Sequence, residues 1–112
     1  MPNNVKPKPT SNDYYVYDRI NQYGDIGFIL VEGSRIIIKK WENYDFFIHL
    51  NIDTFKGYTV REGITGTDIC NGRTKKEATN NAYNYFSKVS KIRFNRDLIH
   101  ILNVSGISPR YK

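Results

Sequence analysis

The chain has 112 residues, of which 39% are hydrophobic and 25% are charged, and its formal net charge at pH 7 is +6. Its length suffices for one domain, and its composition is typical of neither a disordered chain nor a membrane protein. It has a single cysteine, no apolar run near the roughly 18 residues of a membrane span, and no apolar stretch after Met1. We therefore expect a cytoplasmic protein with no intramolecular disulfide, membrane span or signal peptide.

Residues 1–13 are predicted to be a flexible N-terminal tail. They hold three of the four prolines, which disfavour a helix, and few apolar side chains that could join a core. From Tyr14 onward, β-branched and aromatic residues become frequent. Residues 14–112 are therefore predicted to form a single α+β domain.

The first half of this domain has the pattern of an antiparallel meander. Apolar runs separated by turn residues predict strands at residues 14–17, 27–31, 35–41, 46–50, 57–62 and 67–70. The short segments 32–34 and 63–66 predict tight hairpins between neighbouring strands. We therefore expect one antiparallel sheet of five to six strands.

The strongest local signal is a helix that follows the last predicted strand. Thr74 and Glu77 have the spacing of a capping box, in which each side chain hydrogen-bonds the backbone amide of the other. Behind them, apolar residues repeat at helical spacing: Ala78, Ala82, Tyr85, Phe86, Val89 and Ile92. This pattern predicts one main helix over about residues 75–90, packed against the sheet.

A second, shorter helix is predicted near the C-terminus. It is expected to begin at residues 94–97 and to end at residues 105–106, where Gly106 is a typical helix stop. Its buried stripe would consist of Leu98, Ile101 and Leu102.

The charge is unevenly distributed along the chain. Residues 1–72 hold eight basic and nine acidic residues, a balance of −1, whereas residues 73–112 hold nine basic residues against Glu77 and Asp97, a balance of +7. Such clustering favours a polyanionic partner, because cations that replace counterions on phosphates gain free energy. The alternative is a solvated basic helix that only keeps the protein soluble.

The candidate binding residues are cations near the two ends of the main predicted helix, with a further pair in the preceding sheet. They are Arg73, Lys75, Lys76, Lys88, Lys91, Arg93 and Arg96, with Lys39 and Lys40 as a secondary patch. Lys75 and Lys76 fall in the first helical turn, where each opposes the helix dipole by about 0.3–1 kcal/mol. Retention of cations at an unfavourable position suggests a ligand, although solubility is again the alternative.

Aromatic residues make up 14% of the chain and are interleaved with cations in the predicted sheet. The aromatic residues concerned are Tyr14, Tyr15, Tyr17, Tyr23, Trp41 and Tyr44, and the cations among them are Arg19, Arg35, Lys39 and Lys40. Aromatic rings beside cations are suited to stacking on bases while holding the backbone. Core packing and cross-strand pairing are the competing explanation.

No motif in the sequence indicates catalysis. His49 and His100 lack the spacing of a metal site, and Cys70 has no family signature of a nucleophile around it. We therefore expect packed or surface histidines, a semi-buried cysteine, and a non-enzymatic protein without a metal or other cofactor.

The strand, hairpin and helix between Gly57 and Ser90 resemble small accessory modules of phages and conjugative elements of low-GC bacteria. The resemblance rests on residues 57–62, the Thr65-Gly66 turn and residues 72–78. It implies that the chain comes from a phage or mobile element, and it assigns no functional residue.

The sequence thus favours a small basic protein that binds DNA or RNA through phosphate contacts, with little sequence specificity. The alternative is a protein-binding inhibitor of a host defence enzyme. An anti-CRISPR protein that acts on a nuclease, a ribonucleoprotein or its guide RNA would be an example. A membrane partner is expected in neither case.

Overall fold

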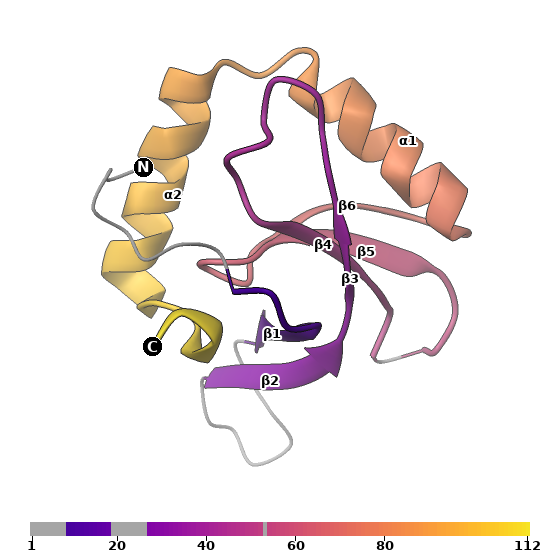
Figure 1. Ribbon diagram of the computed structural model, residues 1–112, viewed down its shortest axis with the longest axis horizontal. Coiled ribbons are helices and arrows are strands. Elements are labelled where there is room, and N and C mark those ends of the chain that lie inside the picture. Colours follow the sequence, from indigo (N-terminus) through magenta and orange to yellow (C-terminus); the bar gives the residue numbers. More distant parts are fainter. Residues whose placement is uncertain (1–8, 19–26, 53) are drawn as a thin grey trace.

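The computed structural model describes residues 9–18, 27–52 and 54–112. Its strands are β1 (Asp13–Asp18), β2 (Gly27–Glu32), β3 (Ser34–Ile36), β4 (Phe46–Leu50), β5 (Tyr58–Glu62) and β6 (Asp68–Gly72). They are followed by helix α1 (Lys75–Phe86), helix α2 (Lys91–Ser105) and a 3-10 turn, η1 (Pro109–Tyr111), as shown in Figure 1. The α+β class is confirmed.

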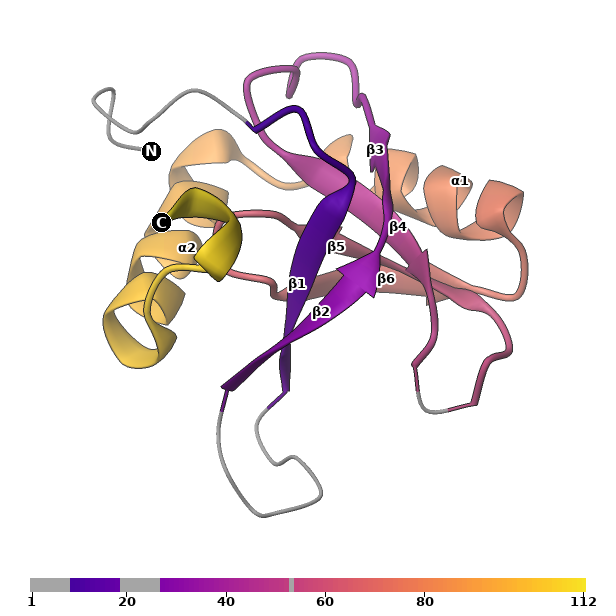
Figure 2. The same ribbon diagram turned by 60° about the horizontal axis from the view of Figure 1, so that its bottom comes forward.

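Within the described residues, the strands form two antiparallel sheets rather than the single sheet that we expected. β1 pairs with β2 over six residues of each strand, and the other sheet has the order β3-β4-β5-β6. The segment 32–34 is therefore no hairpin, because β2 and β3 pair with different neighbours. Figure 2 shows β2 and β3 following one another as the chain passes from one sheet to the other.

Gly33, between β2 and β3, explains this change of sheet. The rings of Tyr14 and Phe47 stack beside it, with centroids 4.2 Å apart. A Cβ at Gly33 would lie 2.8 Å from the Tyr14 ring and 3.0 Å from the Phe47 ring. The absence of a side chain thus lets the backbone cross over the ring stack that joins the two sheets.

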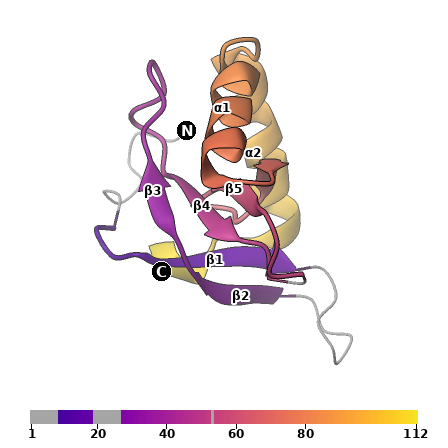
Figure 3. The same ribbon diagram turned by 90° about the vertical axis from the view of Figure 1, so that its right-hand side faces the viewer.

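β4 lies at the centre of a three-layered arrangement. Phe46 and Ile48 face the helices and join the core with Trp41, Ala82 and Phe86 of the neighbouring segments. Phe47 faces the opposite way and packs with Tyr14, Val16 and Val31 of the β1–β2 pair. Alternating side chains of one strand therefore enter two cores. Figure 3 shows the helices and the β1–β2 pair on opposite sides of the larger sheet.

The main helix predicted over about residues 75–90 begins where expected but ends earlier. Thr74 accepts a hydrogen bond from the Glu77 amide at 3.0 Å, but Glu77 reaches the amide of Arg73 (3.4 Å) instead of that of Thr74. α1 ends at Phe86, and Ser90 caps a new helix by accepting from the amide of Arg93 (3.2 Å). With 15 residues against 12, α2 is the longer helix, contrary to expectation.

The predicted buried stripe changes accordingly. Ala78, Ala82 and Phe86, which are spaced by four residues, form the buried face of α1. Tyr85 is not part of this buried face and is 39% exposed. Ile92 lies on the outer face of α2 and is 83% exposed. The residues of the predicted single stripe thus belong to two different helices and the connection between them.

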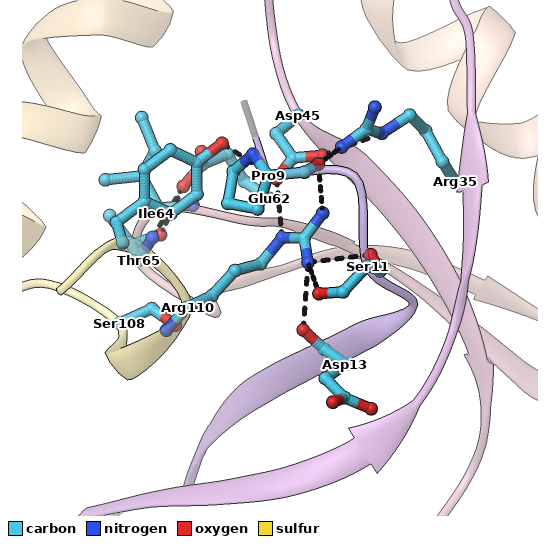
Figure 4. Close-up of polar contacts among 11 residues, drawn as sticks. Pro9, Ser11, Asp13, Arg35, Asp45, Glu62, Ile64, Thr65, Ser108 and Arg110 are labelled. Atoms are coloured by element: carbon cyan, nitrogen blue, oxygen red, sulfur yellow. Dashed lines mark hydrogen bonds and ion pairs between the residues drawn. The ribbon is translucent and has the colours of Figure 1, made fainter. Parts of the chain in front are cut away.

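Arg110 of η1 holds the end of the predicted tail against the domain. Its guanidinium donates to the carbonyl oxygens of Pro9 (3.0 Å), Ser11 (2.9 Å) and Asp13 (2.9 Å), and to the Asp45 carboxylate (2.8 Å). Figure 4 shows this network, in which Arg35 also reaches Asp45 (3.2 Å) and the Pro9 carbonyl. Residues 1–8 of the predicted tail lie outside the described residues.

Candidate nucleic-acid interface

The structure places all nine predicted cations on the surface, in three groups. The α1-start cluster consists of Arg73, Lys75 and Lys76. The junction cluster consists of Lys39, Lys40, Lys88 and Lys91, and Arg93 and Arg96 lie farther along α2. The 12 residues of α1 separate the two clusters by about 18 Å, at 1.5 Å per residue.

The junction cluster forms because the Lys39-Lys40 pair lies in a turn instead of the predicted strand 35–41. The Trp41 amide donates to the Ile38 carbonyl (2.9 Å), and the Trp41 indole donates to the carbonyl of Phe86, the last residue of α1 (3.2 Å). These bonds hold the turn against the α1–α2 connection. Figure 1 shows the segment between β3 and β4 reaching toward that connection between the two helices.

Lys91 reaches the same region from α2, and Lys88 precedes it in the chain. Lys88 lies in the connection between the helices, and the Lys91 ammonium lies 5.6 Å from the centroid of the Trp41 ring. Glu42 is the neighbouring acid, and its pKa is lowered by backbone amides of Glu42 and Lys40 and, to a lesser degree, by Lys91 and Lys39. Four lysines and one ionised carboxylate therefore leave this region with a charge of +3.

A groove of about 460 Å³ opens beside Lys39 and Lys40 of the junction cluster. It is lined by Ile38, Lys39, Lys40 and Trp41 from the turn and by Tyr83, Phe86 and Ser87 from α1. Ile38, Trp41 and Phe86 are almost fully buried, whereas Tyr83 is 45% exposed. The groove therefore has an apolar floor, one accessible aromatic ring and lysines on its rim.

Lys40 adopts a backbone conformation that disfavours lysine. Its φ of 73° lies in the left-handed region, which costs a residue with a Cβ about 1–2 kcal/mol relative to glycine. Glycine or asparagine would fit this turn position better. A cation thus occupies a position at which folding alone favours a smaller residue.

The α1-start cluster is more loosely organised. Arg73 forms an exposed ion pair with Glu77 (3.7 Å), and the Lys75 ammonium lies 5.7 Å from the Tyr58 ring centroid. Lys56 lines a shallow cleft together with Arg73 and Glu77, so it adds a cation that sequence reasoning missed. No periodicity could have placed Lys56 there, because it belongs to the loop before β5.

The aromatic residues chosen as stacking candidates are largely occupied by packing. Tyr14 and Trp41 are buried, and the half-buried Tyr44 donates to the Asn95 side chain at 2.6 Å. Tyr15 and Tyr17 lie half-buried on the outer face of β1, whereas Tyr23 and Arg19 fall outside the described residues. Among the described residues that line the groove beside Lys39 and Lys40, the accessible ring is that of Tyr83, three positions before Phe86 at the margin of the apolar stripe.

The histidines and the cysteine have structural surroundings. Burial lowers the pKa of His49, whose Nε2 accepts from Arg61 (2.9 Å) and whose Nδ1 lies 2.7 Å from the Leu50 carbonyl. Burial raises the pKa of Cys70, which keeps its thiol protonated at neutral pH, and His100 is exposed on α2. Among the described residues, three or more metal-ligating side chains do not gather at any point. None of the helices described here is long and apolar enough to cross a membrane.

Comparison of the chain with protein-family models, curated proteins and solved structures finds no match. Function must therefore be inferred from the chemistry of the surface itself.

Proposed function

We propose that this chain is a non-enzymatic protein that binds nucleic acid through phosphate contacts, and that the junction cluster is its main contact. The observation that carries the proposal is the approach of three lysines to one place. Lys39 and Lys40 line the groove, and the Lys91 ammonium lies 5.6 Å from the ring of Trp41, which also lines it. These residues come from segments about fifty positions apart, so the fold concentrates charge that the sequence distributes.

Phosphate binding follows from the charge and exposure of these side chains. Lysine ammonium groups on an open rim can each displace a counterion from a phosphate, which makes binding favourable and salt-dependent. The α1-start cluster, about 18 Å away along α1, provides a second contact for a long ligand. Flexible lysines carry little base information, so we expect weak sequence specificity.

The test measures binding of a fluorescently labelled 20-nucleotide strand and its duplex by anisotropy, from low salt upward. We expect dissociation constants in the micromolar range or lower at low salt. The logarithm of the association constant should fall linearly with the logarithm of the salt concentration. The decisive variant is Lys40→Gly, which removes one charge and relieves the left-handed strain. It should unfold at an equal or higher urea concentration than the parent, while its salt slope falls by about 0.7–0.9, the value of one phosphate contact.

The matched control is Lys112→Gln, which removes one charge from an exposed residue outside both clusters. Its affinity and salt slope should stay close to those of the parent. If neither nucleic acid forms a complex at micromolar protein and low salt, or if both variants weaken binding equally, the proposal is wrong.

A second candidate function, a protein-binding inhibitor of a host defence enzyme, is favoured by the outer face of the β1–β2 pair. Tyr14 and Val16 point into the core, so Tyr15 and Tyr17 lie on the opposite face, where the Tyr17 and Phe28 rings meet at 5.3 Å. Leu30 on the same face is 56% exposed. Tyrosine-rich apolar surface is typical of protein interfaces.

This alternative predicts that the tagged protein captures one host nuclease from a lysate, and that nuclease treatment of the lysate does not release it. Leu30→Asp should abolish the capture and leave nucleic-acid binding unchanged, whereas Lys40→Gly should do the reverse. Loss of the captured protein after nuclease treatment would instead favour the first proposal.

A further inference from the structure

The groove of the junction cluster has a feature that phosphate binding alone does not use. Its floor is made by Ile38, Trp41 and Phe86, which are 3–4% exposed, and Tyr83 also lines it, with 45% of its surface accessible. A surface that only attracted phosphates would need cations and no accessible aromatic ring. The groove thus offers both a charge and a stacking surface.

The Tyr83 ring is held in a defined position. Its hydroxyl reaches the Ile37 carbonyl at 3.4 Å, so the side chain spans from α1 to the turn that carries Lys39 and Lys40. The Trp41–Phe86 hydrogen bond (3.2 Å) fixes the same turn from below. Because both walls are fixed, a planar ligand can enter without the ring having to be ordered first.

The volume and charge of the groove limit the class of ligand. A volume of about 460 Å³ lies within the range of roughly 300–1,000 Å³ that is usual for small-molecule sites, and it is open to solvent. Lys39 and Lys40 line it and Lys91 lies beside Trp41, so the groove favours a ligand that carries negative charges next to its planar group. A nucleotide within a strand has this combination, with a base between two phosphates.

We propose that the groove binds single-stranded nucleic acid, with one unpaired base stacked on Tyr83 and its flanking phosphates held by the junction cluster. This inference rests on the proposed function and specifies its ligand. In a duplex the base faces are covered by their neighbours in the stack, so a concave aromatic site cannot reach them. In a single strand the faces are accessible, and every base offers a π-face.

The experiment compares three 20-nucleotide ligands of equal phosphate count per strand: a mixed-sequence single strand, its duplex, and a strand whose bases are replaced by abasic sites. All three ligands are made with deoxyribose, and the single strand and the duplex are also made with ribose. The comparison shows whether the protein prefers DNA or RNA. The proteins are the parent, Tyr83→Ala and Tyr83→Phe. Tyr83→Ala replaces an exposed helical residue by the best helix former, so it should fold.

We expect the parent to bind the single strand more tightly than the duplex or the abasic strand. Tyr83→Ala should lose about tenfold in affinity for the single strand and little for the abasic strand, because stacking on one ring contributes about 1–3 kcal/mol and 1.4 kcal/mol is tenfold. Tyr83→Phe keeps the ring but loses the hydrogen bond to the Ile37 carbonyl, so it should bind the single strand more tightly than Tyr83→Ala does.

Two outcomes would overturn the inference in distinguishable ways. If the parent binds all three ligands alike, or if Tyr83→Ala binds the single strand like the parent, phosphate binding stands and base stacking is wrong. If the parent binds none of the three, the proposed function itself fails, and the assignment of a ligand to the groove fails with it.

Discussion

At the scale of single residues, Glu62 is a carboxylic acid enclosed entirely within the protein. It is fully buried, and its carboxylate accepts hydrogen bonds from the amides of Ile64 and Thr65 and from the Thr65 hydroxyl, each at 2.8 Å. Burial nevertheless raises its pKa to about 7, and the nearby Asp45 contributes in the same direction. The loss of hydration therefore outweighs three good hydrogen bonds.

Stability should consequently depend on the protonation of Glu62. Because the folded pKa is above the ordinary value of 4.5, the native state binds the proton more tightly than the unfolded chain does. This stabilisation is complete below pH 4.5 and is lost as the pH rises through about 7. Between pH 5 and pH 8, we expect the unfolding free energy of the parent to fall by about 2–3 kcal/mol relative to that of Glu62→Gln.

Urea unfolding of both proteins at the two pH values measures this difference. His49 acts in the opposite sense, since its lowered pKa removes stability as the pH falls below 6.5, but it is present in both proteins and cancels. The same pH dependence in the parent and in Glu62→Gln would contradict the assignment.

At the scale of elements, the first turn of α1 combines a good cap with unfavourable charges. Thr74 caps the helix, and Glu77 is the acid of the first turn, as helix stability favours. Lys75 and Lys76, at the first two helical positions, oppose the dipole. Local sequence therefore stabilises the start of α1 through its cap and weakens it through its lysines.

The double change Lys75→Glu with Lys76→Glu separates stability from binding. Acids at these positions favour the helix by about 0.3–1 kcal/mol each, so the melting temperature should stay equal or rise slightly. Affinity for nucleic acid should fall by about tenfold or more at low salt, because two contacts of the α1-start cluster are reversed in charge. Lys112→Glu serves as the control and should change neither quantity appreciably; a double variant that binds like the parent would place the contact elsewhere.

At the scale of the whole molecule, Arg110 and Asp45 join segments from both ends of the described chain. Asp45 accepts from Arg110 and from the Tyr111 hydroxyl, both at 2.8 Å, and its side chain is inaccessible to solvent. Arg110 also stacks over Tyr14, with its guanidinium carbon 3.8 Å from the ring centroid. β1, η1 and the residue that precedes β4 thus share one buried polar centre.

Arg110→Ala should therefore lower the unfolding free energy strongly. Removing one partner of a buried ion pair typically costs about 3–5 kcal/mol, because the remaining charge loses its compensation. Arg93→Ala, which changes an exposed arginine of α2, should stay within about 0.5 kcal/mol of the parent. Urea unfolding followed by circular dichroism measures both, and similar midpoints for the two variants would show that the network contributes little.

Much of the secondary structure was predictable, because its signals are local. The cap at Thr74, the strand at residues 46–50 and the hairpin before β6 follow from spacing and turn chemistry within a few residues. The boundary between α1 and α2 was missed. Neither glycine nor proline marks it, and Ser90 is a weak signal without its capping bond.

The candidate site was predictable in composition but not in assembly. The lysines selected from the charge distribution are exposed, but the +7 balance of residues 73–112 also counts Arg110, which is buried. Tyr83 was overlooked because a helical pattern identifies the buried face and does not show what lies at its margin.

The sequence by itself determined the α+β class, the start of α1 and the concentration of positive charge after residue 72. These depend on backbone propensity, capping and net charge, which act over a few residues or need no positions at all. Only the tertiary structure decided the division into two sheets at Gly33, the meeting of Lys39, Lys40 and Tyr83 at one groove and the burial of Arg110. Those outcomes depend on contacts such as Trp41 with Phe86 and Asp45 with Arg110, which are 45 and 65 residues apart in the chain. Packing of the whole core selects such pairs, and no local pattern encodes them.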